Sequence, residues 1–73
     1  MYKEIFAEKL KKARSDTGLS QREVAKELNL SKSTIASYEM GRTEPDIETL
    51  AKLADFYQVS TDWLLSTKGG KMQ

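Results

Sequence analysis

The chain has 73 residues, contains no cysteine and no histidine, and carries a formal net charge of +1. A chain of this length holds one small domain and leaves no room for a separate catalytic domain. The missing residue types exclude disulfide bonds, thiolate zinc sites and histidine acid/base chemistry. We therefore expect no enzymatic activity, no metal and no cofactor.

The charges are distributed unevenly along the chain. Residues 1–42 contain nine Lys/Arg and six Asp/Glu, whereas residues 43–73 contain three and five. A basic half is typical of a domain that meets phosphates with one face, although a solvated surface of mixed charge gives the same counts. No apolar run approaches the roughly 20 residues of a membrane span, and the N-terminus lacks the apolar centre of a signal peptide. The sequence predicts a cytoplasmic protein without membrane contact.

Apolar residues recur at helical spacing throughout, and alternating β-branched runs are missing, so the sequence predicts helices only. The first helix is expected over Tyr2–Thr17, with Phe6, Leu10 and Ala13 on its inner side. Gly18 follows as a residue that tolerates positive φ, which predicts the end of this helix.

The clearest boundary signal precedes the second predicted helix, Gln21–Leu28. Ser20 and Glu23 have the spacing of a capping box, in which each side chain satisfies the other residue's free backbone N–H. Leu19 and Val24 flank the cap and are expected to pack together as a hydrophobic staple.

A short turn separates the second helix from a third, predicted over residues 32–40. Asn29 suits the left-handed backbone that such a turn requires, and Ser31 is the expected cap. Gly41 is the expected stop. Two short helices joined in this way predict a helix-turn-helix unit over residues 21–40.

Two further caps predict two further helices. Asp46 precedes the pattern of residues 47–57, and Ser60 precedes a short helix over residues 61–65. The chain is thus expected to be an all-α, compact five-helix domain over residues 1–65. The sequence after Leu65 is polar and glycine-containing and predicts a flexible tail over residues 66–73.

The third predicted helix has an outward face of short side chains with one lysine among them. Its members are Lys32, Ser33, Thr34, Ala36 and Ser37. A helix with short side chains can approach the major groove of DNA closely, and hydroxyl and ammonium groups can hydrogen-bond base edges there.

Several separate motifs make the chain resemble the Xre/Cro–repressor family of phage-repressor-like helix-turn-helix domains. The resemblance covers roughly residues 5–65, and its motifs are LSQREVA (19–25), LSKSTI (30–35), YEMGRTEP (38–45) and VSTDWLL (59–65). One departure is Asn29, where the family often has Gly, and Asn tolerates that geometry. The resemblance implies a lambda-repressor-like fold and a sequence-specific DNA-binding transcriptional regulator, in particular a repressor.

The resemblance also implies individual roles on double-stranded DNA. The positions that match base readers are Lys32, Ser33 and Ser37. The positions assigned to phosphate binding are Gln21, Ser31, Thr34, Arg42, Thr43 and Arg14, with Ser31 added because a cap hydroxyl can also face a phosphate. Arg14 and Glu39 match a structural pair that ties the first helix to the third.

Each of these side chains also has an ordinary structural interpretation. Taken alone, Gln21 is an exposed helix residue, Lys32 a solvated lysine, and Ser33 and Ser37 common surface residues. The whole chain also has two alternative functions to DNA binding. One is a protein-interaction module on the same fold, such as an antitoxin or adaptor, and the other, more remote, is an enzyme fragment.

The resemblance implies partners as well. Related domains bind palindromic operators as two-fold dimers. We expect a homodimer formed by the fifth helix and the end of the fourth, because Trp63, Leu64 and Leu65 make an apolar run there. A protein regulator is a further expected class of partner.

Overall fold

The computed structural model describes residues 2–66, and this range forms five α-helices and no strand. The helices are α1 (Tyr2–Thr17), α2 (Gln21–Leu28), α3 (Lys32–Glu39), α4 (Ile47–Tyr57) and α5 (Thr61–Leu65). The predicted all-α five-helix fold is confirmed. The one difference in helix bounds is that α3 ends at Glu39 and Met40 serves as its C-cap. The predicted tail, apart from Ser66, lies outside the described residues.

Short polar side chains fix where the helices begin. Ser20 Oγ accepts the Glu23 backbone N–H at 3.1 Å, and Glu23 Oε1 accepts the Ser20 backbone N–H at 2.8 Å. This is the predicted capping box. Ser31, Asp46 and Ser60 each accept a backbone N–H three residues further on and so cap α3, α4 and α5. All four caps were identified from the sequence because capping depends on neighbouring residues alone.

Residues with positive φ end the helices or follow them closely. Gly18 and Gly41 have φ values of 77° and 71°, and Asn29, in the turn between α2 and α3, has φ 59° and ψ 41°. Gln58 and Ser66 also adopt the left-handed conformation, as the C-caps of α4 and α5, and the sequence did not predict these two.

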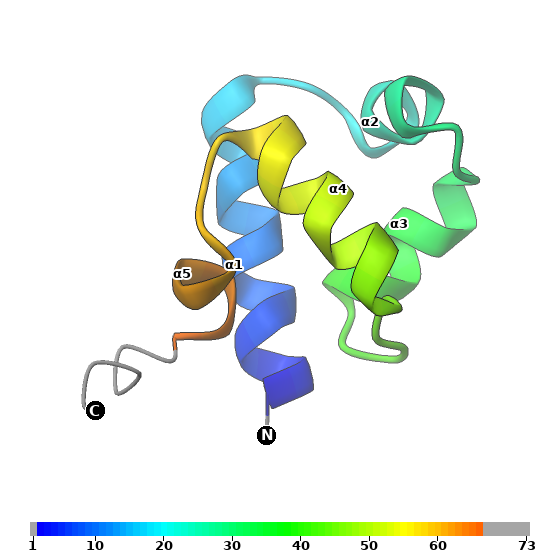
Figure 1. Cartoon of the computed structure of the whole chain (residues 1–73). Coiled ribbons are helices and arrows are strands. Elements are labelled where there is room, and N and C mark those ends of the chain that lie inside the picture. The colour runs from blue at the N-terminus through cyan, green and yellow to red at the C-terminus, as the bar shows by residue number, and fades with distance from the viewer. Residues whose placement is uncertain (1, 67–73) are drawn as a thin grey trace.

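The core lies where α1 meets α3, α4 and α5, while α2 packs against α3 (Figure 1). The largest side chains that are fully buried come from all five helices and are Phe6, Leu10, Val24, Ile35, Leu53 and Leu64. Burying a side chain of this size contributes about 1.5–3 kcal/mol. In Figure 1, α2 and α3 lie together at one side of the molecule and α5 lies at the other. The helix-turn-helix unit therefore has one side packed on the core and one side exposed.

Backbone hydrogen bonds set the turn between α2 and α3. Leu30 N–H donates to Ala25 O at 2.8 Å, and Asn29 N–H donates to Lys26 O at 3.3 Å. Leu28 and Leu30, on either side of Asn29, both pack against the core. The left-handed conformation of Asn29 is thus what lets the chain reverse while both leucines stay in contact with the core.

We predict that Asn29→Val lowers the free energy of unfolding by about 1–2 kcal/mol, because a side chain branched at Cβ is strained in the left-handed conformation. Asn29→Gly is the matched control, since glycine adopts this conformation without strain. Urea denaturation followed by circular dichroism measures both. Equal stability of the two variants would contradict the role given to this turn.

Candidate nucleic-acid interface

The inner and outer sides of α3 differ sharply in polarity and burial. Ile35, Tyr38 and Glu39 are buried against the rest of the domain. Lys32 and Ser33 are exposed, and Thr34, Ala36 and Ser37 are half-buried. Within residues 2–66, the side chains of Lys32, Ser33 and Ser37 form no hydrogen bond or ion pair. The structure therefore brings the three predicted base readers together on one helix with their polar groups unused.

The beginning of α3 holds two hydroxyl groups that the sequence assigns to phosphate binding. Ser31 Oγ accepts the Thr34 backbone N–H at 3.1 Å, and Ser31 Oγ and Thr34 Oγ1 lie 2.8 Å apart. One hydroxyl hydrogen is used between the two oxygens. The other hydroxyl hydrogen remains able to donate to a partner outside the protein. The two side chains thus act as a pair that offers one donor.

Arg14 and Glu39 form a two-pronged ion pair between α1 and α3. Arg14 Nε donates to Glu39 Oε2 at 2.7 Å, and Arg14 Nη2 donates to Glu39 Oε1 at 3.0 Å. The hydrogen bond to Glu39 raises the pKa of Arg14. Arg14 Nη1 also donates to the backbone oxygen of Leu19 at 3.0 Å, just before α2 begins. Arg14 is therefore bonded both to α3 and to the residue before the cap of α2.

Gln21, the first residue of α2, joins the same carboxylate. Its Nε2 donates to Glu39 Oε1 at 3.0 Å. Glu39 is a residue of α3 and is only 4% exposed. Its buried carboxylate accepts hydrogen bonds from Arg14 on α1 and from Gln21 on α2. The sequence interpretation missed the contact between Gln21 and Glu39. After this bond, Gln21 keeps one amide hydrogen and its side-chain oxygen for an external partner.

Tyr57 of α4 lies in the electrostatic field of this ion pair. Burial raises the pKa of Tyr57 to about 12, with a smaller raising effect from Glu39 and an opposing effect from Arg14. Its hydroxyl has no hydrogen-bond partner among the described residues. The phenol is neutral at ordinary pH, as an unshifted tyrosine would also be, so Tyr57 adds no charge near the ion pair.

The loop after α3 carries the remaining residues predicted to bind phosphate. Arg42 and Thr43 are exposed. The Arg42 backbone N–H donates to Ser37 O at 3.0 Å, which fastens the beginning of the loop to α3. The Arg42 side chain forms no ion pair within residues 2–66, so its guanidinium is available to an anion next to the end of α3.

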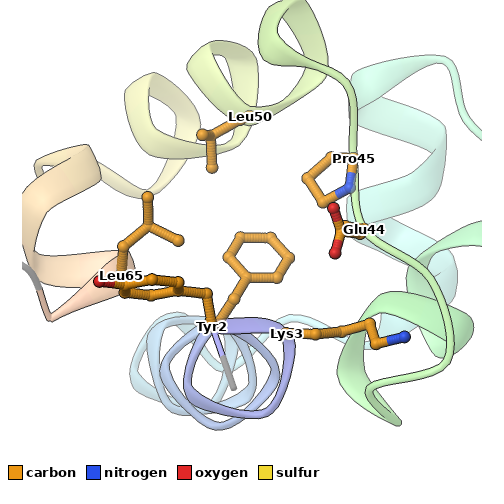
Figure 2. Close-up of a pocket in the computed structure, with 7 residues that line it drawn as sticks. Tyr2, Lys3, Glu44, Pro45, Leu50 and Leu65 are labelled. Atoms are coloured by element: carbon orange, nitrogen blue, oxygen red, sulfur yellow. The ribbon is translucent and has the colours of Figure 1, made fainter.

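A separate apolar pocket of about 250 Å³ lies between the beginning of α1, the loop after α3, α4 and α5 (Figure 2). It was not predicted from the sequence, because its walls come from distant segments. They are Tyr2, Lys3, Phe6, Glu44, Pro45, Leu50 and Leu65. Trp63, also on α5, is half-buried, and the Lys9 ammonium lies 4.8 Å from the centre of its ring.

Within residues 2–66, no three or more acidic side chains gather in an arrangement that could hold a metal ion. None of the five helices is both long enough and apolar enough to cross a membrane.

The helix-turn-helix family model matches residues 10–64 of the chain. The chain is 44% identical over 61 residues to the SPbeta prophage-derived uncharacterized HTH-type transcriptional regulator YonR of Bacillus subtilis. The aligned region covers 84% of this chain and 56% of that protein. It is 43% identical over 60 residues to the HTH-type transcriptional regulator ImmR of the same species, covering 82% and 47%. It is 39% identical over 62 residues to the cryptic phage CTXphi transcriptional repressor RstR of Vibrio cholerae, covering 85% and 56%.

The chain spans about half the length of these curated relatives. Among solved structures, the crystal structure of the clp gene regulator ClgR from C. glutamicum superposes with a TM-score of 0.80 at 27% sequence identity. The match covers 100% of this chain and 95% of that one. The fold and the family thus agree with the resemblance seen in the motifs.

We predict that Arg14→Met lowers the free energy of unfolding by about 3 kcal/mol, because it leaves the buried Glu39 carboxylate without its cation. The double variant Arg14→Met/Glu39→Leu is the matched control and should recover much of this loss, since no buried charge remains. Thermal and urea unfolding measure both variants. A double variant no more stable than the single one would show that the unpaired carboxylate is not the cause.

Proposed function

We propose, because the chain belongs to the helix-turn-helix family, that it is a sequence-specific DNA-binding transcriptional regulator, and more narrowly a repressor. The observation that carries the proposal is the outer side of α3, where Lys32, Ser33 and Ser37 present unused polar groups on a helix whose inner side is fixed to the core. The relatives are named as transcriptional regulators, and the name of one of them specifies a repressor. We propose no catalytic role for the chain and a location in the cytoplasm, together with the DNA.

In this proposal α3 lies in the major groove and reads base edges. Lys32 stands at the first turn, and a lysine there can donate to the acceptors of a guanine. Ser33 and Ser37 are one turn apart on the same side and can donate or accept. Because the two serine side chains are short, the backbone of α3 must come close to the floor of the groove for their hydroxyl groups to reach the base edges.

The proposed phosphate contacts surround this helix. Gln21 uses its remaining amide hydrogen, supported by the free N–H groups at the beginning of α2. Ser31 and Thr34 together supply one hydroxyl donor, and Arg42 and Thr43 act from the loop. Arg14 is a further proposed phosphate contact, in addition to its bonds to Glu39. Neutralising phosphates in this way releases counterions, so affinity should fall steeply as salt rises.

We further propose that residues 1–65 form the DNA-binding domain, with residues 21–40 as its helix-turn-helix unit, and that two copies bind a palindromic operator. A two-fold dimer sets two copies of α3 about one helical turn of DNA apart. The proposed contact uses α5 and the end of α4. On α5, Leu65 lines the apolar pocket (Figure 2). Trp63 on the same helix is half-buried. A protein regulator remains a proposed further partner.

We predict different effects from the two kinds of contact. Lys32→Ala and Ser37→Ala should change which DNA sequences are preferred. Gln21→Ala and Arg42→Ala should weaken binding to all sequences. Arg42→Ala should also make the slope of log affinity against log salt concentration shallower by about 1. Lys52→Ala, an exposed lysine on α4, is the matched control and should change neither quantity. Fluorescence anisotropy with specific and random duplexes at several salt concentrations measures these effects.

If all four substitutions affect specific and random DNA equally, the assignment of base readers is wrong. If the wild-type chain binds no duplex even at low salt, while its binding to a protein is insensitive to salt, the protein-interaction module becomes the better account.

We predict that the chain sediments as a dimer, two copies on one palindromic duplex, and that Leu65→Glu reduces this to a single copy per duplex at the same protein concentration. Leu65→Met is the control that keeps the apolar volume, and circular dichroism verifies that both variants are folded. Sedimentation of the wild type as a monomer even with operator present would contradict the proposed dimer.

A further inference from the structure

The outer side of α3 carries two parallel rows of side chains. Residues four apart on an α-helix lie nearly above one another. One row is therefore Lys32, Ala36 and Met40, and the row beside it is Ser33 and Ser37. Met40 belongs to the first row because its backbone N–H donates to Ala36 O at 2.9 Å, which continues the helical register through the cap residue.

Met40 is 60% exposed, which is a large apolar exposure on a face whose other exposed side chains, Lys32 and Ser33, are polar. A single exposed methionine needs no explanation on its own. Its alignment with Ala36 makes it informative. Helical side chains lean toward the N-terminus, so Met40 is directed over the turn that contains Ala36, and the short alanine leaves that space open. By their register, Ala36 and Met40 form an apolar row between Lys32 and the loop after α3.

The major-groove edges of unmodified bases offer one apolar group, the 5-methyl group of thymine, and it lies beside the acceptor O4 of the same base. An apolar row next to a hydroxyl row matches this pair of features. Ser33 or Ser37 can donate to O4 while Ala36 or Met40 contacts the methyl group. Methionine suits such a contact because its side chain is flexible and polarizable.

We propose that Ala36 and Met40 determine sequence preference by contacting thymine 5-methyl groups, so that each half-site of the operator contains at least one thymine read in this way. The inference rests on the proposed function, because it requires α3 to lie in the major groove. It assigns a reading role to two residues outside the polar set of Lys32, Ser33 and Ser37.

The test uses the wild-type chain and changes only the DNA. Selection from a random duplex library gives the preferred site, and each thymine is then replaced in turn by deoxyuridine, which lacks the methyl group. We expect affinity to fall about fourfold at one or two thymines of each half-site, the loss associated with one buried methyl group. Replacements elsewhere should have no effect.

Protein variants then locate the contact. Met40→Gln or Ala36→Ser should abolish the sensitivity to deoxyuridine at one of these thymines, whereas Met40→Leu should retain it. Ile47→Gln is the matched control, because Ile47 is 86% exposed but lies on α4, and it should leave the sensitivity unchanged.

Three outcomes would overturn the inference while leaving DNA binding intact. They are a selected half-site without thymine, a wild-type affinity that no deoxyuridine replacement changes, and a sensitivity that survives both Met40→Gln and Ala36→Ser. Failure of the wild-type chain to select any site would instead overturn the proposed function, and this inference with it.

Discussion

The arrangement of the helix-turn-helix unit depends on one buried carboxylate. Glu39 accepts hydrogen bonds from Arg14 on α1 and from Gln21 on α2 while its own backbone belongs to α3. A buried charge is costly unless it is paired and hydrogen-bonded, so displacing any of these three helices leaves the carboxylate partly unsatisfied. The network therefore favours one arrangement of α1, α2 and α3 over its alternatives.

The inner side of the helix-turn-helix unit, which faces the core, and its exposed outer side differ in whether their polar side chains are already bonded. On the inner side, Arg14 and Glu39 are bonded to each other, and the buried phenol of Tyr57 adds no charge. On the outer side, the polar groups of Lys32, Ser33 and Arg42 are unoccupied within residues 2–66. A helix held rigidly from behind can present short side chains without losing much conformational entropy on binding, which is the advantage of preorganisation.

Local features of the fold followed from the sequence and long-range features did not. Ser20, Glu23 and Asn29 act on residues within a few positions of themselves, so their roles were visible in the spacing of residue types. The pair of Arg14 and Glu39 spans 25 positions and came only from the family resemblance. The bond between Gln21 and Glu39 and the apolar pocket depend on how helices cross, which no local pattern encodes. The roles on DNA remain predictions for the same reason, since they concern a partner.

Whether α3 and its surroundings form the DNA-binding surface is tested most directly by nuclear magnetic resonance. The isotopically labelled chain is titrated with a duplex that carries one half-site, and the amide chemical shifts are monitored. A single half-site keeps the dimer contact out of the measurement. We expect the largest changes at the beginning of α2, along α3 and at residues 42–43, with little change in α5. Large changes around the apolar pocket, with α3 unaffected, would contradict this expectation.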